Sequence, residues 1–125
     1  MSVRIPVVTT RRAATLASIE RHKVSAIIRA DDREKAQKAM EAAVLGGFRV
    51  VEFTLTTPGA LDLVREFSKR PGLVVGAGTV LDTRVARDAV AAGAEFLVSP
   101  VTDPEIISGT FLPNCSNTSA EPFTK

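Results

Sequence analysis

The sequence predicts an α/β fold in which a parallel sheet is covered by helices. Four short apolar runs, rich in β-branched residues, begin near positions 24, 49, 73 and 95, a repeat of roughly 22–25 residues. Each run is followed by a capping residue and then by apolar residues at helical spacing. Near-continuous apolar strands that alternate with helices are typical of parallel sheets buried on both faces.

The first two units are bounded by clear helix signals. Residues 24–29 form the first expected strand, and Asp31 or Asp32 is placed to cap the helix that follows and ends near Gly46. Residues 49–55 form the second strand. We expect the next helix to open at Thr57-Pro58, with proline in its first turn.

The last two units follow the same pattern. Residues 73–78 form the third strand, and Asp82 or Thr83 caps a helix that Gly93 stops. Residues 95–99 form the fourth strand, and a further helix begins near Asp103. We expect four parallel strands in sequential order with the helices on one side, because right-handed crossovers in one direction keep them there.

The length of 125 residues fits one domain. We assign 1–12 to a flexible N-terminal tail, 13–107 to the α/β domain, and 108–125, rich in Ser, Thr, Asn and Pro, to an irregular C-terminal tail. Two architectures fit the domain: a small doubly wound sheet, or part of a (β/α)8 barrel. A whole barrel needs eight strands and at least ~200 residues.

Composition excludes several classes of function. The net charge is only +2 with charges of mixed sign, and all six aromatic residues are Phe, which argues against nucleic-acid binding. No apolar stretch approaches the ~20 residues of a membrane helix. A single cysteine and a single histidine exclude multi-cysteine and multi-histidine metal sites, so we expect no metal.

The first residues of the chain give a weak indication of where the protein is located in the cell. Residues 1–12 contain three Arg and no acidic residue, which weakly resembles a plastid or other organelle transit peptide; a frayed tail is the simpler interpretation. No apolar segment of ~7–15 residues marks a secretory signal. We therefore expect a cytoplasmic protein.

Four residues near the strand ends are candidates for chemistry. Glu52 lies inside an apolar strand, where a carboxylate is costly unless it is paired; it is either catalytic, a buried ion pair, or a solvent-facing edge residue. Arg29 ends the first strand and can hold a carboxylate, or simply be solvated. Thr79 and Pro100 follow the third and fourth strands, where ligands bind in parallel α/β sheets, although both also suit ordinary loops.

Taken together, four motifs resemble the KDPG/KHG aldolases, class I enzymes that cleave 2-keto-3-deoxy-6-phosphogluconate or 4-hydroxy-2-oxoglutarate to pyruvate plus an aldehyde. The resemblance runs from about residue 24 to 107. Its motifs are Val24–Asp32, Ala43–Gly59, Val75–Leu81 and Ala91–Pro100.

The resemblance implies the N-terminal half of a TIM (β/α)8 barrel, commonly trimeric in this family, so we expect a homo-oligomer. It implies a 2-keto acid of the pyruvate type as substrate and a Schiff base between a lysine and the keto group, with no cofactor. It gives Glu52 the role of proton shuttle and places Thr79 and Pro100 at the pyruvate site. Some members bind the substrate carboxylate with an arginine after the second strand, where this sequence has Thr56. The resemblance therefore assigns the binding of the substrate carboxylate to Arg29, at the end of the first strand.

In the family, the Schiff-base lysine lies on the sixth strand, and only four strands are expected here. We therefore expect this chain by itself to be an inactive, truncated aldolase. Two alternatives stay open: a non-catalytic half barrel that associates with itself or with a full-length subunit, and a four-stranded domain that binds a small acid without turnover.

Overall fold

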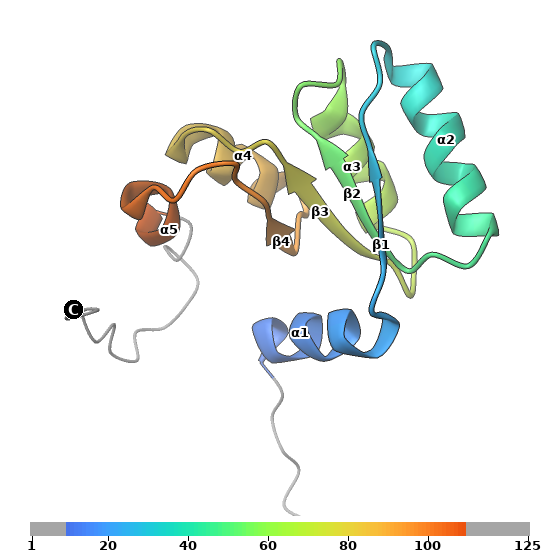
Figure 1. The fold of residues 1–125 in the computed structure, drawn as a ribbon, viewed down its shortest axis with the longest axis horizontal. Coiled ribbons are helices and arrows are strands. Elements are labelled where there is room, and N and C mark those ends of the chain that lie inside the picture. The colour runs from blue at the N-terminus through green and yellow to red at the C-terminus, as the bar shows by residue number, and fades with distance from the viewer. Residues whose placement is uncertain (1–9, 110–125) are drawn as a thin grey trace, which may run out of the picture.

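The computed structural model describes residues 10–109 and shows one parallel four-stranded sheet. The strands are β1 (Ser25–Ile28), β2 (Val50–Thr54), β3 (Val74–Gly78) and β4 (Phe96–Leu97), in the order β1-β2-β3-β4 (Figure 1). All neighbouring pairs are parallel, which confirms the expected α/β class and strand order. The expected range 108–125 lies outside the described residues, apart from the end of α5.

Three helices pack on one face of the sheet. They are α2 (Arg33–Leu45), α3 (Ala60–Ser68) and α4 (Thr83–Ala92). Alternation along β2 directs Val51 and Phe53 to this face, and both are fully buried. They share one apolar core with residues of all three helices: Ala36, Met40, Leu63, Val64, Phe67, Ala89 and Ala92.

The helix ends follow from local chemistry, with one correction. The carboxylates of Asp32 and Asp82 accept hydrogen bonds from Lys35 N and Val85 N, and thereby cap α2 and α4 as expected. The expected helix start at Thr57-Pro58 is wrong: α3 begins at Ala60, after Gly59 with φ 73°. The Thr57 hydroxyl bonds to Ala30 N instead of capping the helix.

The two remaining helices lie at the ends of the described chain. Helix α1 (Arg11–His22) is capped by Thr10, so Arg11 and Arg12, which we assigned to a tail, are helical. It lies across the end of the sheet at which the strands begin (Figure 1), and Thr15 Oγ1 donates to Glu95 Oε2 over 2.9 Å. Helix α5 (Pro104–Gly109) follows β4. Across residues 10–109, no helix is both long and apolar enough to cross a membrane.

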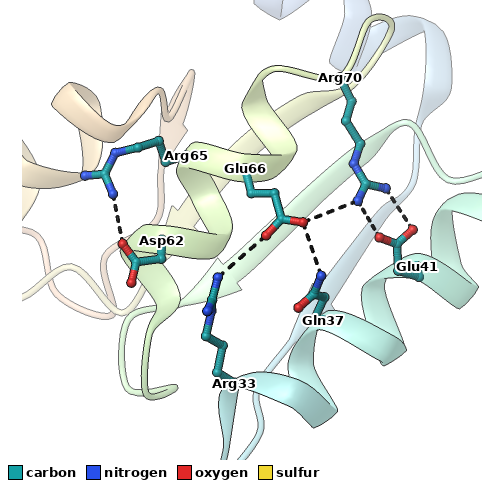
Figure 2. A network of polar contacts seen from close by, with 7 residues as sticks. All are labelled: Arg33, Gln37, Glu41, Asp62, Arg65, Glu66 and Arg70. Atoms are coloured by element: carbon teal, nitrogen blue, oxygen red, sulfur yellow. Dashed lines mark hydrogen bonds and ion pairs between the residues drawn. The ribbon is translucent and has the colours of Figure 1, made fainter.

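A polar network joins α2 to the end of α3 (Figure 2). Arg70 donates a pair of hydrogen bonds to Glu41, and its guanidinium stacks 4.0 Å from the ring centre of Phe67. Hydrogen bonding from Arg70 lowers the pKa of the Glu41 carboxyl. Partly exposed ion pairs contribute only about 0.2–1 kcal/mol, so the apolar layer beneath the network dominates the helix–sheet attachment.

Candidate functional site

The strand register places Glu52 on the sheet face opposite the helices. Glu52 is paired with Ile27 on β1 and with Gly76 on β3, and Gly76 is paired with Phe96 on β4. Paired residues of parallel strands point to the same face, and the neighbours of Glu52 in β2 point into the helix core. Glu52 therefore points to the face that would line the interior of a closed barrel.

The glycines of β3 make room for two side chains on this face. A Cβ atom on Gly78 would collide with the Glu52 carboxyl group and would lie only 2.9 Å from Glu52 Cδ. A Cβ atom on Gly76 would overlap the ring of Phe96. The Gly-Ala-Gly sequence of β3 is thus explained by packing: the carboxyl group of Glu52 rests directly on the backbone of the next strand.

Glu52 is the buried acid of this face. Glu52 is 4% exposed, and among the described residues no charged side chain acts on its carboxyl group as an ion-pair partner. Burial raises the pKa of the Glu52 carboxyl above its ordinary value of 4.5. Burial without an ionic partner favours the proton-exchange interpretation of Glu52 over a buried ion pair, because a carboxyl group with a raised pKa is suited to exchange protons.

The raised pKa of Glu52 makes a prediction about stability. Between its ordinary and raised pKa, the folded chain holds a proton that the unfolded chain releases, so stability falls as pH rises and stays lowered above the raised pKa. We expect Glu52→Gln to stabilise the chain by ~1 kcal/mol at pH 7, with the gain vanishing below pH ~4.

Urea denaturation across this pH range measures the effect. The matched control is Glu34→Gln, because Glu34 is exposed on α2 and pairs with Lys38 at the surface. It should change stability by less than ~0.5 kcal/mol. A destabilised Glu52→Gln at pH 7 would mean that the ionised carboxylate has a favourable partner.

Arg29 and Thr79 meet at the end where the strands finish. Arg29 follows β1 and Thr79 follows β3, and Arg29 Nη2 donates to Thr79 Oγ1 over 3.2 Å. The Arg29 side chain thus reaches past the end of β2, which lies between the two strands. Thr79 has φ 60°, an uncommon backbone conformation for a β-branched residue and one that is concentrated at functional sites.

Two buried threonines belong to this end of the sheet and were not among our candidates. Thr54 and Thr57 are 4% and 2% exposed, and their hydroxyl oxygens lie 3.3 Å apart. From the sequence we gave Thr54 no role and interpreted Thr57 as part of a helix start. The sequence signal was the cluster of three threonines within four residues at the end of the strand that carries Glu52.

Among residues 10–109, no hydrogen bond joins Pro100 to Glu52, Arg29 or Thr79. It is exposed in the bend after β4, where Ser99 Oγ accepts from Val101 N. Its place at the pyruvate site stays a prediction. An open groove of about 550 Å³ lies between α3 and α4, but it is lined by neither Glu52, Arg29 nor Thr79. The burial and contacts of Glu52, and not this groove, therefore locate the candidate site.

The described lysines lie away from Glu52. Lys35 pairs with Asp31 at 2.9 Å on α2, and Lys38 lies on the same helix. Lys23 and Lys69 stand at the C-terminal ends of α1 and α3. Among residues 10–109 no group of three or more His, Cys, Asp or Glu side chains is arranged to hold a metal ion.

Comparison with known proteins gives a consistent result. A family model described as KDPG and KHG aldolase matches residues 16–116, a longer stretch than the motifs alone cover. The 2-dehydro-3-deoxy-phosphogluconate aldolase of Zymomonas mobilis is 47% identical over 70 residues, which span 56% of this chain and 34% of that protein.

Solved structures agree with the sequence comparison. A Zymomonas mobilis 2-keto-3-deoxy-6-phosphogluconate aldolase with 3-phosphoglycerate superposes with a TM-score of 0.67 at 36% identity, covering 76% of this chain and 46% of that one. The Legionella pneumophila KDPG aldolase, with pyruvate captured as a covalent carbinolamine, gives 0.64 at 33% identity, covering 81% and 48%.

The matched part of this chain spans about a third to a half of the length of these relatives. Their TIM barrels explain the curled sheet with helices on one face, so the four strands correspond to about half of such a barrel. Because the family model covers most of the sequence and the solved relatives share the fold at more than 30% identity, the chain belongs to the KDPG and KHG aldolase family.

Proposed function

We propose that this chain supplies the acid–base and carboxylate-binding part of an aldolase site that cleaves a 2-keto-3-deoxy or 4-hydroxy-2-keto acid to pyruvate and an aldehyde. One observation carries the proposal. Glu52 is a buried acid with a raised pKa on the barrel-interior face of β2, the strand whose C-terminal end the Arg29–Thr79 contact passes. Membership of the family supports it.

Each side chain has a role that its chemistry suits. Arg29 binds the substrate carboxylate through paired hydrogen bonds, and Thr79 offers a hydroxyl beside it. Glu52 takes a proton from the C4 hydroxyl as the C3–C4 bond breaks, and returns a proton to C3 of the resulting enamine. Pro100 completes the wall of the keto-acid pocket.

The reaction also needs an amine. In the Legionella relative pyruvate is held as a carbinolamine, the adduct of an amine nitrogen with the keto carbon. Loss of water from such an adduct gives an iminium group, which accepts the electron pair of the breaking C3–C4 bond. The described lysines lie on helices away from Glu52, so we propose that this amine comes from the other half of the barrel.

Titration of the chain with pyruvate, followed by amide chemical shifts in NMR spectra, tests the carboxylate site. We expect Arg29→Gln to weaken pyruvate binding at least about tenfold, the scale of losing a charged hydrogen-bonded pair. The control is Arg65→Gln, which removes an exposed arginine that pairs with Asp62 on α3 (Figure 2). Pyruvate binding that is absent, or equal in both variants, would contradict the proposed carboxylate site.

Two properties of the whole protein remain proposals that follow from the sequence. We propose a cytoplasmic location, with an organelle as the alternative that the acid-poor start of the chain supports. We propose self-association, supported by the position of β1 at the edge of the sheet and by Ile27, which is 58% exposed on the face opposite the helices.

A further inference from the structure

Arg29 lies just beyond the hydrogen-bond ladder of the sheet. The last paired residues of β1 and β2 are Ile28 and Phe53. An arginine at a frayed strand end would sample many positions, and fixing a long side chain costs conformational entropy. Yet the Arg29 guanidinium reaches across to Thr79, so its backbone needs another anchor.

Two buried hydroxyl groups bind the backbone on either side of Arg29. Thr54 Oγ1 donates to the carbonyl of Ile28 over 3.4 Å, and Thr57 Oγ1 accepts from the N–H of Ala30 over 3.1 Å. These two backbone groups belong to the residues immediately before and after Arg29.

The hydroxyl groups also satisfy one another. Their oxygens are 3.3 Å apart, and Thr57 can donate to Thr54 while Thr54 donates to Ile28. Thr56 Oγ1 is a second donor to Thr54 Oγ1 over 3.3 Å, but among the described contacts it binds neither backbone group beside Arg29. Thr57 Oγ1 therefore accepts a hydrogen bond from Ala30 N–H and donates one to Thr54 Oγ1, so this buried hydroxyl group is used both as acceptor and as donor.

From this arrangement we infer that Thr57 is a positioning residue for Arg29: through its buried hydroxyl it holds the β1–α2 connection at the angle from which the guanidinium meets Thr79. The inference rests on the carboxylate-binding role proposed for Arg29. A hydroxyl group on the β2–α3 loop thus sets the reach of the arginine that follows β1.

Two substitutions at Thr57 distinguish the effect of its hydroxyl group from the effect of its side-chain shape. Thr57→Val keeps the branched shape and removes the hydroxyl, whereas Thr57→Ser keeps the hydroxyl. The matched control is Thr56→Val, which removes a neighbouring hydroxyl without touching the backbone beside Arg29. The first readout is the nuclear Overhauser contact between the Arg29 guanidinium protons and the Thr79 side chain.

We expect this contact in the unaltered chain, in Thr57→Ser and in Thr56→Val, and expect its loss in Thr57→Val. The second readout is pyruvate affinity, which Thr57→Val should weaken about tenfold, the scale of one buried hydrogen bond at a charged site. In an Arg29→Gln background Thr57→Val should weaken it no further, because coupled residues are not additive.

The outcomes distinguish the two proposals. An Arg29–Thr79 contact that persists in Thr57→Val overturns the positioning role. The role is also overturned if Thr57→Val weakens pyruvate binding as much in the Arg29→Gln background as in the unaltered chain. If the unaltered chain binds no pyruvate, the proposed carboxylate site fails, while the Arg29–Thr79 contact still decides the role of Thr57. A fall in thermal stability alone supports neither, so stability is measured only to show that each variant is folded.

Discussion

Borohydride treatment of the 125-residue chain in the presence of pyruvate is expected to leave its intact mass unchanged. A class I aldolase traps pyruvate as an imine on a lysine, and borohydride reduces that imine to a permanent adduct. Lys35 and Lys38 are held in ion pairs on α2, and Lys23 and Lys69 stand at helix ends, all away from Glu52. Lys125 lies outside the described residues.

The expected effect on turnover is correspondingly large. Glu52 can move protons, but it cannot accept the electron pair released when the carbon–carbon bond breaks. Removal of a covalent catalyst usually forfeits several orders of magnitude in rate. Pyruvate release from 2-keto-3-deoxy-6-phosphogluconate, followed with a coupled dehydrogenase, should therefore stay at the uncatalysed level.

A positive control is available among the relatives. The Legionella pneumophila aldolase, in which pyruvate was captured as a carbinolamine, should gain the mass of one reduced pyruvate under the same treatment. A stoichiometric adduct on this chain, with measurable pyruvate release, would contradict the prediction. Peptide mapping would then identify the lysine responsible.

Phe67→Ala is expected to destabilise the chain by about 3–5 kcal/mol, the usual cost of truncating a buried phenylalanine. Phe67 is fully buried on α3, and its ring packs edge-on against Phe53 of β2 with ring centres 5.1 Å apart. The guanidinium group of Arg70 stacks over the Phe67 ring, 4.0 Å from the ring centre. The truncation would thus open a cavity between the sheet and the helix layer and also release the Arg70 stack.

Urea denaturation followed by circular dichroism measures the loss, with Leu45→Ala as control. Leu45 ends α2 and is 87% exposed, so its truncation should cost less than ~0.5 kcal/mol. A loss of less than ~1 kcal/mol for Phe67→Ala would mean that the helices are not packed on the sheet in solution. A chain of marginal stability would unfold altogether on this change, which the baseline in the absence of urea would reveal.

The fold class could be predicted from the sequence because its signals are local. The runs at 24–29, 49–55, 73–78 and 95–99 are apolar and β-branched, and each observed strand lies inside its expected range. Aspartates in front of two helices bind the first free N–H groups of those helices, so Asp32 and Asp82 marked the helix starts. The family resemblance then favoured the barrel over the doubly wound sheet.

The prediction failed where a side chain is used by a distant partner. Thr57-Pro58 resembles a helix start. The Thr57 hydroxyl instead accepts a hydrogen bond from the N–H of Ala30, 27 residues earlier in the chain, and α3 begins only after Gly59. Arg11 and Arg12 resemble a tail because they bear like charges, but Thr10 caps the helix that contains them. In both cases the local pattern was ambiguous, and a hydrogen bond settled it.

The sequence by itself determined the order of the four strands and of the helices that follow them, and the choice of Glu52, Arg29 and Thr79, because periodicity, caps and a charged residue in an apolar strand are visible in one dimension; helix α1 was not predicted. Only the tertiary structure decided that the Glu52 carboxyl group is buried against Gly78, and that Arg29 is flanked by the Thr54 and Thr57 hydroxyls. The physical reason is that burial, and with it the raised pKa of Glu52, depends on neighbouring strands, and no local pattern records which hydroxyl meets which backbone group.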